Sequence, residues 1–290
     1  MGDAFVEVRC PAKVNLFLEV LGRRADGYHE IATVFLKIAL HDTLLAAPAA
    51  EGVTLSVEGA DLPAGEGNLA HAAAQAFRAA FPFEGGVRLR LVKRIPMKAG
   101  LGGGSSDAAG TLLALRDLFR PGMAVESLAA PAAALGSDVP FFLGGPAALG
   151  EGRGEILAGV PPPSPRWFAL CFPPFALSTA DVYREVLVPP EPERRSAVPL
   201  LRALRESPDL DLAPYLYNRL AEAAARVEPE VARLRDRLAA VLAPGEACLL
   251  SGSGSAFFAP LGSLVRALDV RRAWAALPGC RAVVVRSLGG

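Results

Sequence analysis

The sequence contains few lysines and carries no excess of charge of either sign. Its 290 residues include 30 basic and 30 acidic side chains, so the formal net charge is +0. Because no sequence-wide positive field attracts polyanions, neither nucleic acid nor a membrane surface is expected as a partner. Only four of the basic residues are lysines, and this scarcity gives each of them more weight: Lys13, Lys37, Lys93 and Lys98.

Cysteine is equally scarce, and long apolar runs are absent. The four cysteines lie far apart without a CxxC pair, and no basic and apolar signal segment precedes the first strand pattern, which together predict a cytoplasmic protein. No apolar run reaches the roughly 18 to 20 residues that a membrane-spanning helix needs. Two of the three histidines, His41 and His71, have no partners at metal-ligand spacing, so no metal held by the protein is expected.

Hydrophobic residues make up 52% of the chain, which is enough to bury a large core, and the length favours two medium domains. We predict strands in the first hundred residues over 5–10, 13–21, 30–40, 42–47, 53–57 and 87–95. One helix interrupts them over 68–81, where Asn68 is a suitable N-cap and an apolar stripe begins at Leu69. Helical patterns return over 105–119 and 125–135.

Glycine and proline become frequent over 145–165, where the stretch GVPPPSP can neither continue a helix nor form a central strand. We therefore predict two domains, 1–158 and 159–290. The second is expected to contain a strand over 167–172, helices over 179–187, 197–206, 214–227 and 229–242, two short strands around 251–255, a helix over 263–276 and a strand over 281–287. Mixed helices and strands in both halves predict the α+β class.

The densest glycine cluster is PMKAGLGGGSSDA at residues 96–108, directly before a helical pattern. Glycine lets the backbone approach a ligand closely, and amides at a helix start lack intrahelical partners, so the stretch suits phosphate. Ser105, Ser106 and Asp107 would lie in the first turn, where hydroxyls can meet phosphate or its magnesium. The Walker, dinucleotide and nucleophile-elbow motifs do not match. A flexible or helix-capping turn remains the alternative for this stretch alone.

Four segments together resemble the GHMP kinases, the superfamily of galactokinase, homoserine kinase and mevalonate kinase. They are PAKVNLFLEVLGRRADGYHEI at 11–31, PMKAGLGGGSSDAA at 96–109, GSDVPFFLGGPAALGEGRGE at 136–155 and LSGSGSAFF at 250–258. The first and third are similar to the members that phosphorylate a cytidine diphosphate-linked methylerythritol in the non-mevalonate isoprenoid pathway. The resemblance runs in order from residue 11 to about residue 258.

This resemblance implies the two-domain GHMP kinase architecture. A ribosomal-protein-S5-like N-terminal domain would bind ATP and carry out catalysis, and a ferredoxin-like C-terminal domain would contribute to the substrate cleft. The resemblance also implies ATP as co-substrate, with Mg²⁺ carried on its phosphates, and no tightly bound cofactor. The candidate ATP-binding residues are Pro96, Met97, Lys98, Ala99, Gly100, Leu101, Gly102, Gly103, Gly104, Ser105, Ser106 and Asn68.

Three polar residues are candidates for the acceptor site. Lys13 and Asn15 are two apart in a strand pattern and so share one face, although an ordinary solvent face would give the same pattern. Asp138 precedes Val139-Pro140, where it could simply start a turn or cap a helix. The resemblance implies that Lys13 and Asp138 are the catalytic pair, with the carboxylate accepting the hydroxyl proton while the lysine keeps it ionised. It also implies that Asn15 binds substrate.

The remaining candidates concern the base of the substrate. Tyr28 and His29 follow an Asp-Gly turn, and Thr179 and Tyr183 lie in a short helical pattern, so packing or surface roles are the alternatives. The resemblance implies that the two tyrosines stack on the cytosine, that His29 recognises its edge and that Thr179 belongs to the same site. It also places SGSGS at 251–255 near the glycine loop, whereas the pattern alone allows a plain hairpin turn.

Two other functions fit parts of the sequence. If the protein were another GHMP kinase acting on a different alcohol, the DGYH stretch at 26–29, which the resemblance links to cytidine, would be unexplained. If it were a sensor that binds a nucleotide without turnover, the presence of both Lys13 and Asp138 would be unexplained. The sequence makes no prediction of the oligomeric state.

Overall fold

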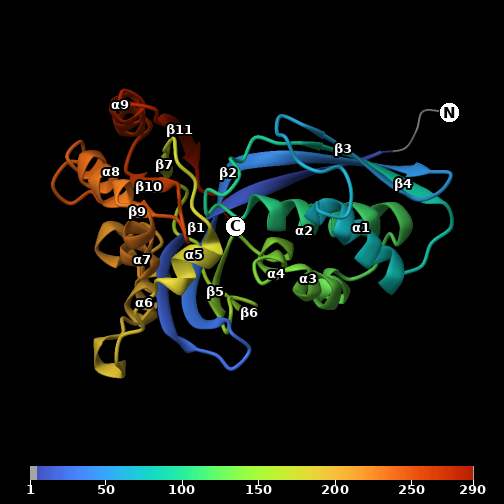
Figure 1. Cartoon of the computed structure of the whole chain (residues 1–290), viewed down its shortest axis with the longest axis horizontal. Coiled ribbons are helices and arrows are strands. Elements are labelled where there is room, and N and C mark those ends of the chain that lie inside the picture. Colours follow the sequence, from blue (N-terminus) through green and yellow to red (C-terminus); the bar gives the residue numbers. More distant parts are fainter. Residues whose placement is uncertain (1–4, 290) are drawn as a thin grey trace. The chain divides into compact units, whose positions relative to one another are not determined.

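The computed structural model describes residues 5–289 and contains two compact units (Figure 1). Unit 1 comprises Leu40–Met97, Gly102–Gly145 and the described residues of Met1–Ala12. Unit 2 comprises Lys13–Ala39, Lys98–Leu101 and the described residues of Pro146–Gly290. The two longest strands, β1 and β2, contribute residues to both units. The predicted domain division after residue 158 stays a prediction.

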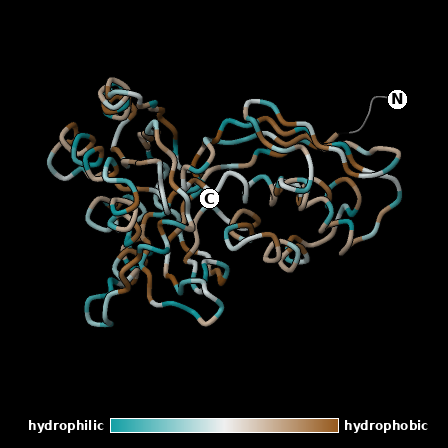
Figure 2. The backbone as a smooth tube through the Cα atoms, in the orientation of Figure 1, coloured by the Kyte–Doolittle hydropathy of each residue, from teal (hydrophilic) through white to brown (hydrophobic). Residues whose placement is uncertain are grey.

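Unit 1 contains a sheet in which β4 (Gly86–Val92) lies between the second half of β2 (His29–Ala49) and β3 (Val53–Glu58). The β2–β4 pair is antiparallel and the β3–β4 pair is parallel. The strand predicted over 87–95 is present as β4, and along it Leu89 and Leu91 are buried while Arg90 between them is exposed, the period-two pattern of a half-buried strand. Figure 2 shows this alternation of apolar and polar residues along the strands of unit 1.

The helices of unit 1 lie on one side of this sheet (Figure 1). They are α1 (Leu69–Ala80), α2 (Gly103–Phe119), α3 (Ala129–Leu135) and α4 (Val139–Leu143), with a 3₁₀ turn at Val125–Leu128. The predicted N-cap of α1 is confirmed, because Asn68 Oδ1 accepts a hydrogen bond from the Ala70 amide at 2.9 Å. The apolar stripe predicted from Leu69 was partly wrong: Leu69 is exposed, although Ala73 and Phe77 farther along the stripe are buried.

Unit 2 contains an antiparallel sheet in the order β11–β7–β10–β9, with α9 packed against β7 and β11. Its strands are β7 (Trp167–Phe172), β9 (Leu249–Leu250), β10 (Phe257–Leu261) and β11 (Arg281–Arg286). Its helices are α5 (Thr179–Arg184), α6 (Val198–Glu206), α7 (Leu220–Val227), α8 (Glu230–Ala239) and α9 (Leu264–Ala275), with a 3₁₀ turn at Glu191–Glu193. Trp274 is completely buried in the core.

A second group of strands in unit 2 has the order β8–β1–β2–β5–β6. It contains β1 (Val6–Arg23), β5 (Ala147–Glu151), β6 (Ile156–Gly159) and β8 (Tyr217–Asn218). The sequence did not predict β5 and β6, because their glycines and neighbouring prolines conceal an antiparallel pair. The predicted helix over 214–227 was also wrong at its start: a 3₁₀ turn at Ala213–Tyr215 and β8 precede α7.

Strands β1 and β2 are each longer than predicted, because neither expected interruption occurs. Pro11 lies within β1, where its fixed φ is compatible with extended backbone. Asp42 lies within β2 and is completely buried. Its Oδ1 atom accepts hydrogen bonds from the amides of Arg94 and Ile95, at 2.5 and 2.8 Å. A residue that usually interrupts strands is therefore stabilised by backbone groups far away in the sequence.

No helix within residues 5–289 is long and apolar enough to cross a lipid bilayer.

Candidate active site

The glycine loop opens helix α2 of unit 1 at Gly102, which has a left-handed φ of 70°. The Ser106 amide donates to the Gly102 carbonyl oxygen at 2.9 Å. Within residues 5–289, the amides of 102–105 donate no hydrogen bond to the protein. The Ser106 amide therefore already belongs to the helix, whereas the amides of 102–105 are available to a ligand. Four successive donors at the start of a 17-residue helix suit an anion.

The preceding part of the loop, residues 98–101, is bound to the SGSGS segment within unit 2. The amides of Ser255 and Ala256 donate to the carbonyl oxygens of Lys98 and Ala99, both at 3.2 Å. Ser251 Oγ donates to the Gly100 carbonyl oxygen at 3.0 Å. Gly100 has a φ of 72°, and a Cβ there would overlap the Ser251 carbonyl oxygen, so only glycine fits. The expected proximity of SGSGS and the loop is confirmed, and residues 251–255 are buried.

Lys13 and Asn15 belong to a chain of hydrogen bonds inside unit 2. Lys13 Nζ donates to Asn15 Oδ1, Asn15 Nδ2 donates to Thr33 Oγ1, and Thr33 Oγ1 donates to the Phe17 carbonyl oxygen, each at 2.7 Å. Lys13 is only 4% exposed, which excludes the ordinary solvent face. A Cβ on Gly252 would lie 3.2 Å from Lys13 Nζ, so the glycine allows the SGSGS backbone to approach the ammonium group. The arrangement holds a buried cation in one position.

Asp138 lies in unit 1, immediately before α4. It is half-buried, and its side chain makes no capping hydrogen bond to the helix, so the alternative role as a side-chain N-cap is not supported. Lys13 belongs to the other unit, and the predicted approach of the two side chains stays a prediction.

The DGYH stretch forms a turn in unit 2 around Gly27, which has a φ of 85°. Asp26 Oδ1 accepts the amide of Tyr28 at 3.1 Å. Tyr28 is 55% exposed, and the guanidinium carbon of Arg153 lies 4.8 Å from its ring centroid, in cation–π contact. Tyr28 thus presents an aromatic surface that a cation orients, and Arg153 is a neighbour that the sequence did not indicate.

The structure brings His29 and Tyr183 together within unit 2. Their ring centroids are 5.3 Å apart, with the planes tilted by 32°. Burial lowers the pKa of His29, and the charge of Arg23 lowers it further, so the imidazole is neutral at neutral pH and can offer one donor and one acceptor. Tyr183 also packs against the core of unit 2. The predicted facing of Tyr28 and Tyr183 stays a prediction.

Thr179 is joined to the SGSGS segment, because its Oγ1 atom lies 2.9 Å from Ser253 Oγ. The same segment is held by Asn218, whose Nδ2 atom donates to the carbonyl oxygens of Leu250 and Gly252, both at 2.8 Å. Asn218 was not among the predicted site residues, because it lies in a segment that was predicted to be helical. SGSGS therefore connects residues from three distant parts of the chain.

The other candidate ATP-binding residues differ in whether their side chains are already engaged in hydrogen bonds or exposed to a ligand. Both polar groups of the Asn68 side chain are engaged, since Oδ1 caps α1 and Nδ2 donates to the Pro63 carbonyl oxygen at 3.0 Å. Met97 and Lys98 are exposed, and Lys98 has a φ of 52°, which is uncommon for a residue with a side chain. Any role of Asn68 toward a nucleotide would therefore use its backbone or require a change of side-chain partner.

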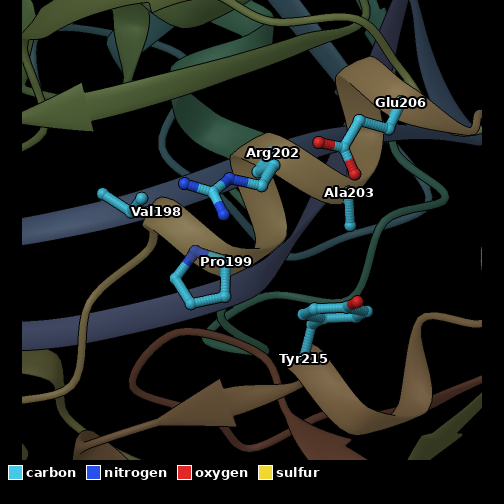
Figure 3. Close-up of a pocket in the computed structure, with 6 residues that line it drawn as sticks. All are labelled: Val198, Pro199, Arg202, Ala203, Glu206 and Tyr215. Carbon is cyan, nitrogen blue, oxygen red and sulfur yellow. The ribbon is translucent and has the colours of Figure 1, made fainter.

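A separate hollow of about 340 Å³ in unit 2 contains none of the candidate residues (Figure 3). It lies between α6 and the 3₁₀ turn that carries Tyr215, whose ring faces Ala203. The hollow is lined by Val198, Pro199, Arg202, Ala203, Glu206 and Tyr215.

Comparisons with known proteins agree with this geometry. Residues 68–146 match the family described as GHMP kinases N terminal domain. The 4-diphosphocytidyl-2-C-methyl-D-erythritol kinase of Pelotomaculum thermopropionicum is 44% identical over 260 residues, covering 89% of this chain and 90% of its own length. The chain belongs to the 4-diphosphocytidyl-2-C-methyl-D-erythritol kinase family. The relative of the same name from Moorella thermoacetica is 43% identical, covering 85% of this chain and 86% of its own.

Solved structures place this kinase family member in the expected fold. A crystal structure of 4-(cytidine 5'-diphospho)-2C-methyl-D-erythritol kinase matches with a TM-score of 0.81 and 39% identity, covering 98% of this chain and all of that one. Homoserine kinase from Cytophaga hutchinsonii, at 18% identity, shares the fold with a TM-score of 0.73 over all of this chain and 96% of its own. The predicted α+β GHMP kinase architecture is confirmed.

One charged cluster next to the glycine loop of this kinase was not predicted from the sequence. In unit 1, Lys93 Nζ forms ion pairs with Asp42 and with Asp107 Oδ2, the second at 2.5 Å. Burial raises the pKa of Asp107 to about 7, although Lys93 opposes the shift. The expectation that Asp107 lies in the first turn of α2 was wrong, because the helix begins two residues earlier than predicted, at Gly103, and Asp107 directly follows that turn. No local pattern could indicate that Asp42 and Lys93 would be its neighbours.

Proposed function

We propose that this protein transfers the γ-phosphoryl group of ATP to the 2-hydroxyl of 4-diphosphocytidyl-2-C-methyl-D-erythritol, in the non-mevalonate pathway to isoprenoid precursors. The observation that carries the proposal is the buried chain from Lys13 through Asn15 to Thr33, which fixes an ammonium group next to the SGSGS segment. Burying a charge is costly, so its retention supports a chemical role. Family membership supports the identity of the acceptor.

In the proposed reaction, the amides of 102–105 bind the phosphates of ATP. Asp138 accepts the proton of the acceptor hydroxyl, and Lys13 stabilises the ionised carboxylate and the negative charge on the transferring group. Magnesium carried on ATP would offset phosphate charge when bound. The residues present fit this ion, because Ser106 Oγ in the first turn of α2 is buried without a hydrogen-bond partner in residues 5–289. Ser105 is the second hydroxyl of that turn.

The cytosine site of the proposal contains Tyr28, His29, Thr179 and Tyr183. A neutral imidazole can form a hydrogen bond with the cytosine edge, and the tyrosine rings provide stacking surfaces. Uridine presents a different edge, which would leave buried polar groups of the site unpaired, so we expect discrimination between the two bases. The division into an ATP-binding part, 1–158, and a part that contributes to the substrate cleft, 159–290, belongs to the proposal, as does a cytoplasmic location.

Phosphorus NMR tests the proposed function directly. The protein is incubated with ATP, magnesium and 4-diphosphocytidyl-2-C-methyl-D-erythritol, and we expect a new phosphomonoester signal coupled with the loss of ATP. Mevalonate and homoserine serve as controls for other GHMP kinase activities and should give no product. Phosphorylation of either control at a comparable rate, or no turnover of the cytidyl compound, would contradict the proposal.

A further inference from the structure

A buried group of three charges lies under the start of helix α2 in unit 1. Lys93 follows β4, Asp42 lies within β2, and Asp107 lies in α2 directly after its first turn. The side chains of these residues are 5%, 0% and 3% exposed, respectively. Because Lys93 Nζ contacts both carboxylates, it connects the sheet of unit 1 with the helix that carries the glycine loop.

The same group also fixes the backbone that follows β4. Asp42 Oδ1 accepts the amides of Arg94 and Ile95, so the chain after Lys93 is held against β2. Gly103, the first residue of α2, lies directly on this segment: a Cβ there would be 3.0 Å from Ile95 Cγ2 and 3.4 Å from Lys93 Nζ. The position of the first helical turn therefore depends on the side chains of residues 93 and 95.

Stability alone is a weak reason for this arrangement. Burying charges carries a desolvation cost that an ion pair often only balances, and apolar residues of similar size would fill the space as well. Two carboxylates share one ammonium group here, and Asp107 Oδ1 is buried without a hydrogen-bond partner within residues 5–289. The neighbouring Ser106 Oγ is also buried without a hydrogen-bond partner in this part of the chain. Ser106 lies in the turn whose amides are available to a ligand, and Asp107 directly follows it.

We propose that Lys93 is a positioning residue for ATP: by bridging Asp42 and Asp107, it holds the first turn of α2 in the orientation that presents the amides of 103–105 to the nucleotide phosphates. This inference rests on the proposed function, since it assumes that ATP binds at the glycine loop. Lys93 acts through Asp107 and the helix. Asp42, completely buried within β2, anchors the ammonium group from the opposite side.

The test measures the dissociation constant of magnesium ATP by calorimetry on folded protein, without the acceptor. We expect Lys93→Met to weaken binding by about tenfold or more, because small displacements of oriented donors have large effects. Asp42→Asn should also weaken binding several-fold, because it removes the charge that anchors Lys93 while keeping an oxygen for the two amides. Arg90→Met is the matched control: Arg90 lies on β4 but forms an exposed ion pair with Glu58. It should change the constant less than twofold.

The two variants separate positioning from other roles. A purely structural role would lower the unfolding temperature and leave the dissociation constant of the folded protein unchanged, which would overturn the proposal. Weaker binding by Lys93→Met with normal binding by Asp42→Asn would mean that Lys93 touches the nucleotide directly, and would overturn it too. If Lys93→Met does not fold, Asp42→Asn decides alone. A wild-type protein that binds ATP but does not phosphorylate the cytidyl compound would contradict the proposed function and leave this test valid.

Discussion

Thr33→Val removes one hydroxyl from the chain that holds Lys13 and changes almost nothing in volume. Thr33 is completely buried, accepts from Asn15 Nδ2 and donates to the Phe17 carbonyl oxygen. Valine can do neither, so one buried donor and one buried acceptor lose their partners. Each such loss costs about 1–3 kcal/mol, and with local relaxation we expect the free energy of unfolding to fall by about 2–4 kcal/mol.

Thr33→Val should also lower turnover, although Thr33 is not among the residues proposed to contact a substrate. The Asn15 amide nitrogen loses its hydrogen-bond acceptor, so the Asn15 side chain can move. Its carbonyl oxygen then no longer holds Lys13 Nζ in one position. We expect the turnover number to fall about tenfold, equivalent to about 1.4 kcal/mol, while the dissociation constant of ATP stays within twofold.

Urea denaturation and a coupled kinase assay measure the two effects. Thr43→Val on the same strand is the matched control, because the Thr43 hydroxyl contacts only the exposed Arg94 guanidinium among the hydrogen bonds of residues 5–289. It should change the free energy of unfolding by less than about 0.5 kcal/mol. An equally small effect of Thr33→Val, or full turnover in that variant, would refute the reasoning that the buried chain fixes Lys13.

Three further substitutions test the parts of the proposed site. Asp138→Asn should lower turnover by about 10²-fold or more while ATP still binds, and near-normal turnover would remove Asp138 from the mechanism. Gly103→Val should raise the Michaelis constant for ATP sharply, because any side chain meets Ile95 and the Lys93 ammonium group; an unchanged constant would argue against ATP at this loop. Tyr183→Ala should weaken the cytidyl substrate several-fold in steady-state kinetics, since stacking contributes roughly 0.5–1.5 kcal/mol, and equal weakening of ATP would contradict a base-specific role.

The elements that could be predicted from the sequence are those whose causes are local. The N-cap at Asn68 and the alternation along β4 each depend on residues within a few positions of one another. The glycine loop before α2 could also be predicted, because the glycines that leave its amides available are consecutive in the sequence. The similarity of four ordered segments to one kinase family extended this local information to the whole chain.

The features that could not be predicted depend on distant partners. The predicted strands end at residue 40 and begin again at Asp42, yet β2 is continuous, because backbone amides more than fifty positions later satisfy the Asp42 carboxylate inside it. Asn218 occurs in a helical pattern, but the carbonyl oxygens of Leu250 and Gly252 hold it in a short strand. In both cases a long-range hydrogen bond outweighs local propensity, and one sequence contains no direct record of such a bond.

The path of β1 and β2 through both units has a consequence for how the protein is made. Leu18 and Ile31 leave the ribosome early, but they belong to the same hydrophobic core as Val270 and Trp274. Synthesis at about 5–20 residues per second means that these early side chains wait on the order of 10–50 s for the rest of their core. The core side chains of β1 and β2 must wait without their partners from α9 until that helix has been synthesised. Unit 2 can therefore complete its folding only near the end of translation.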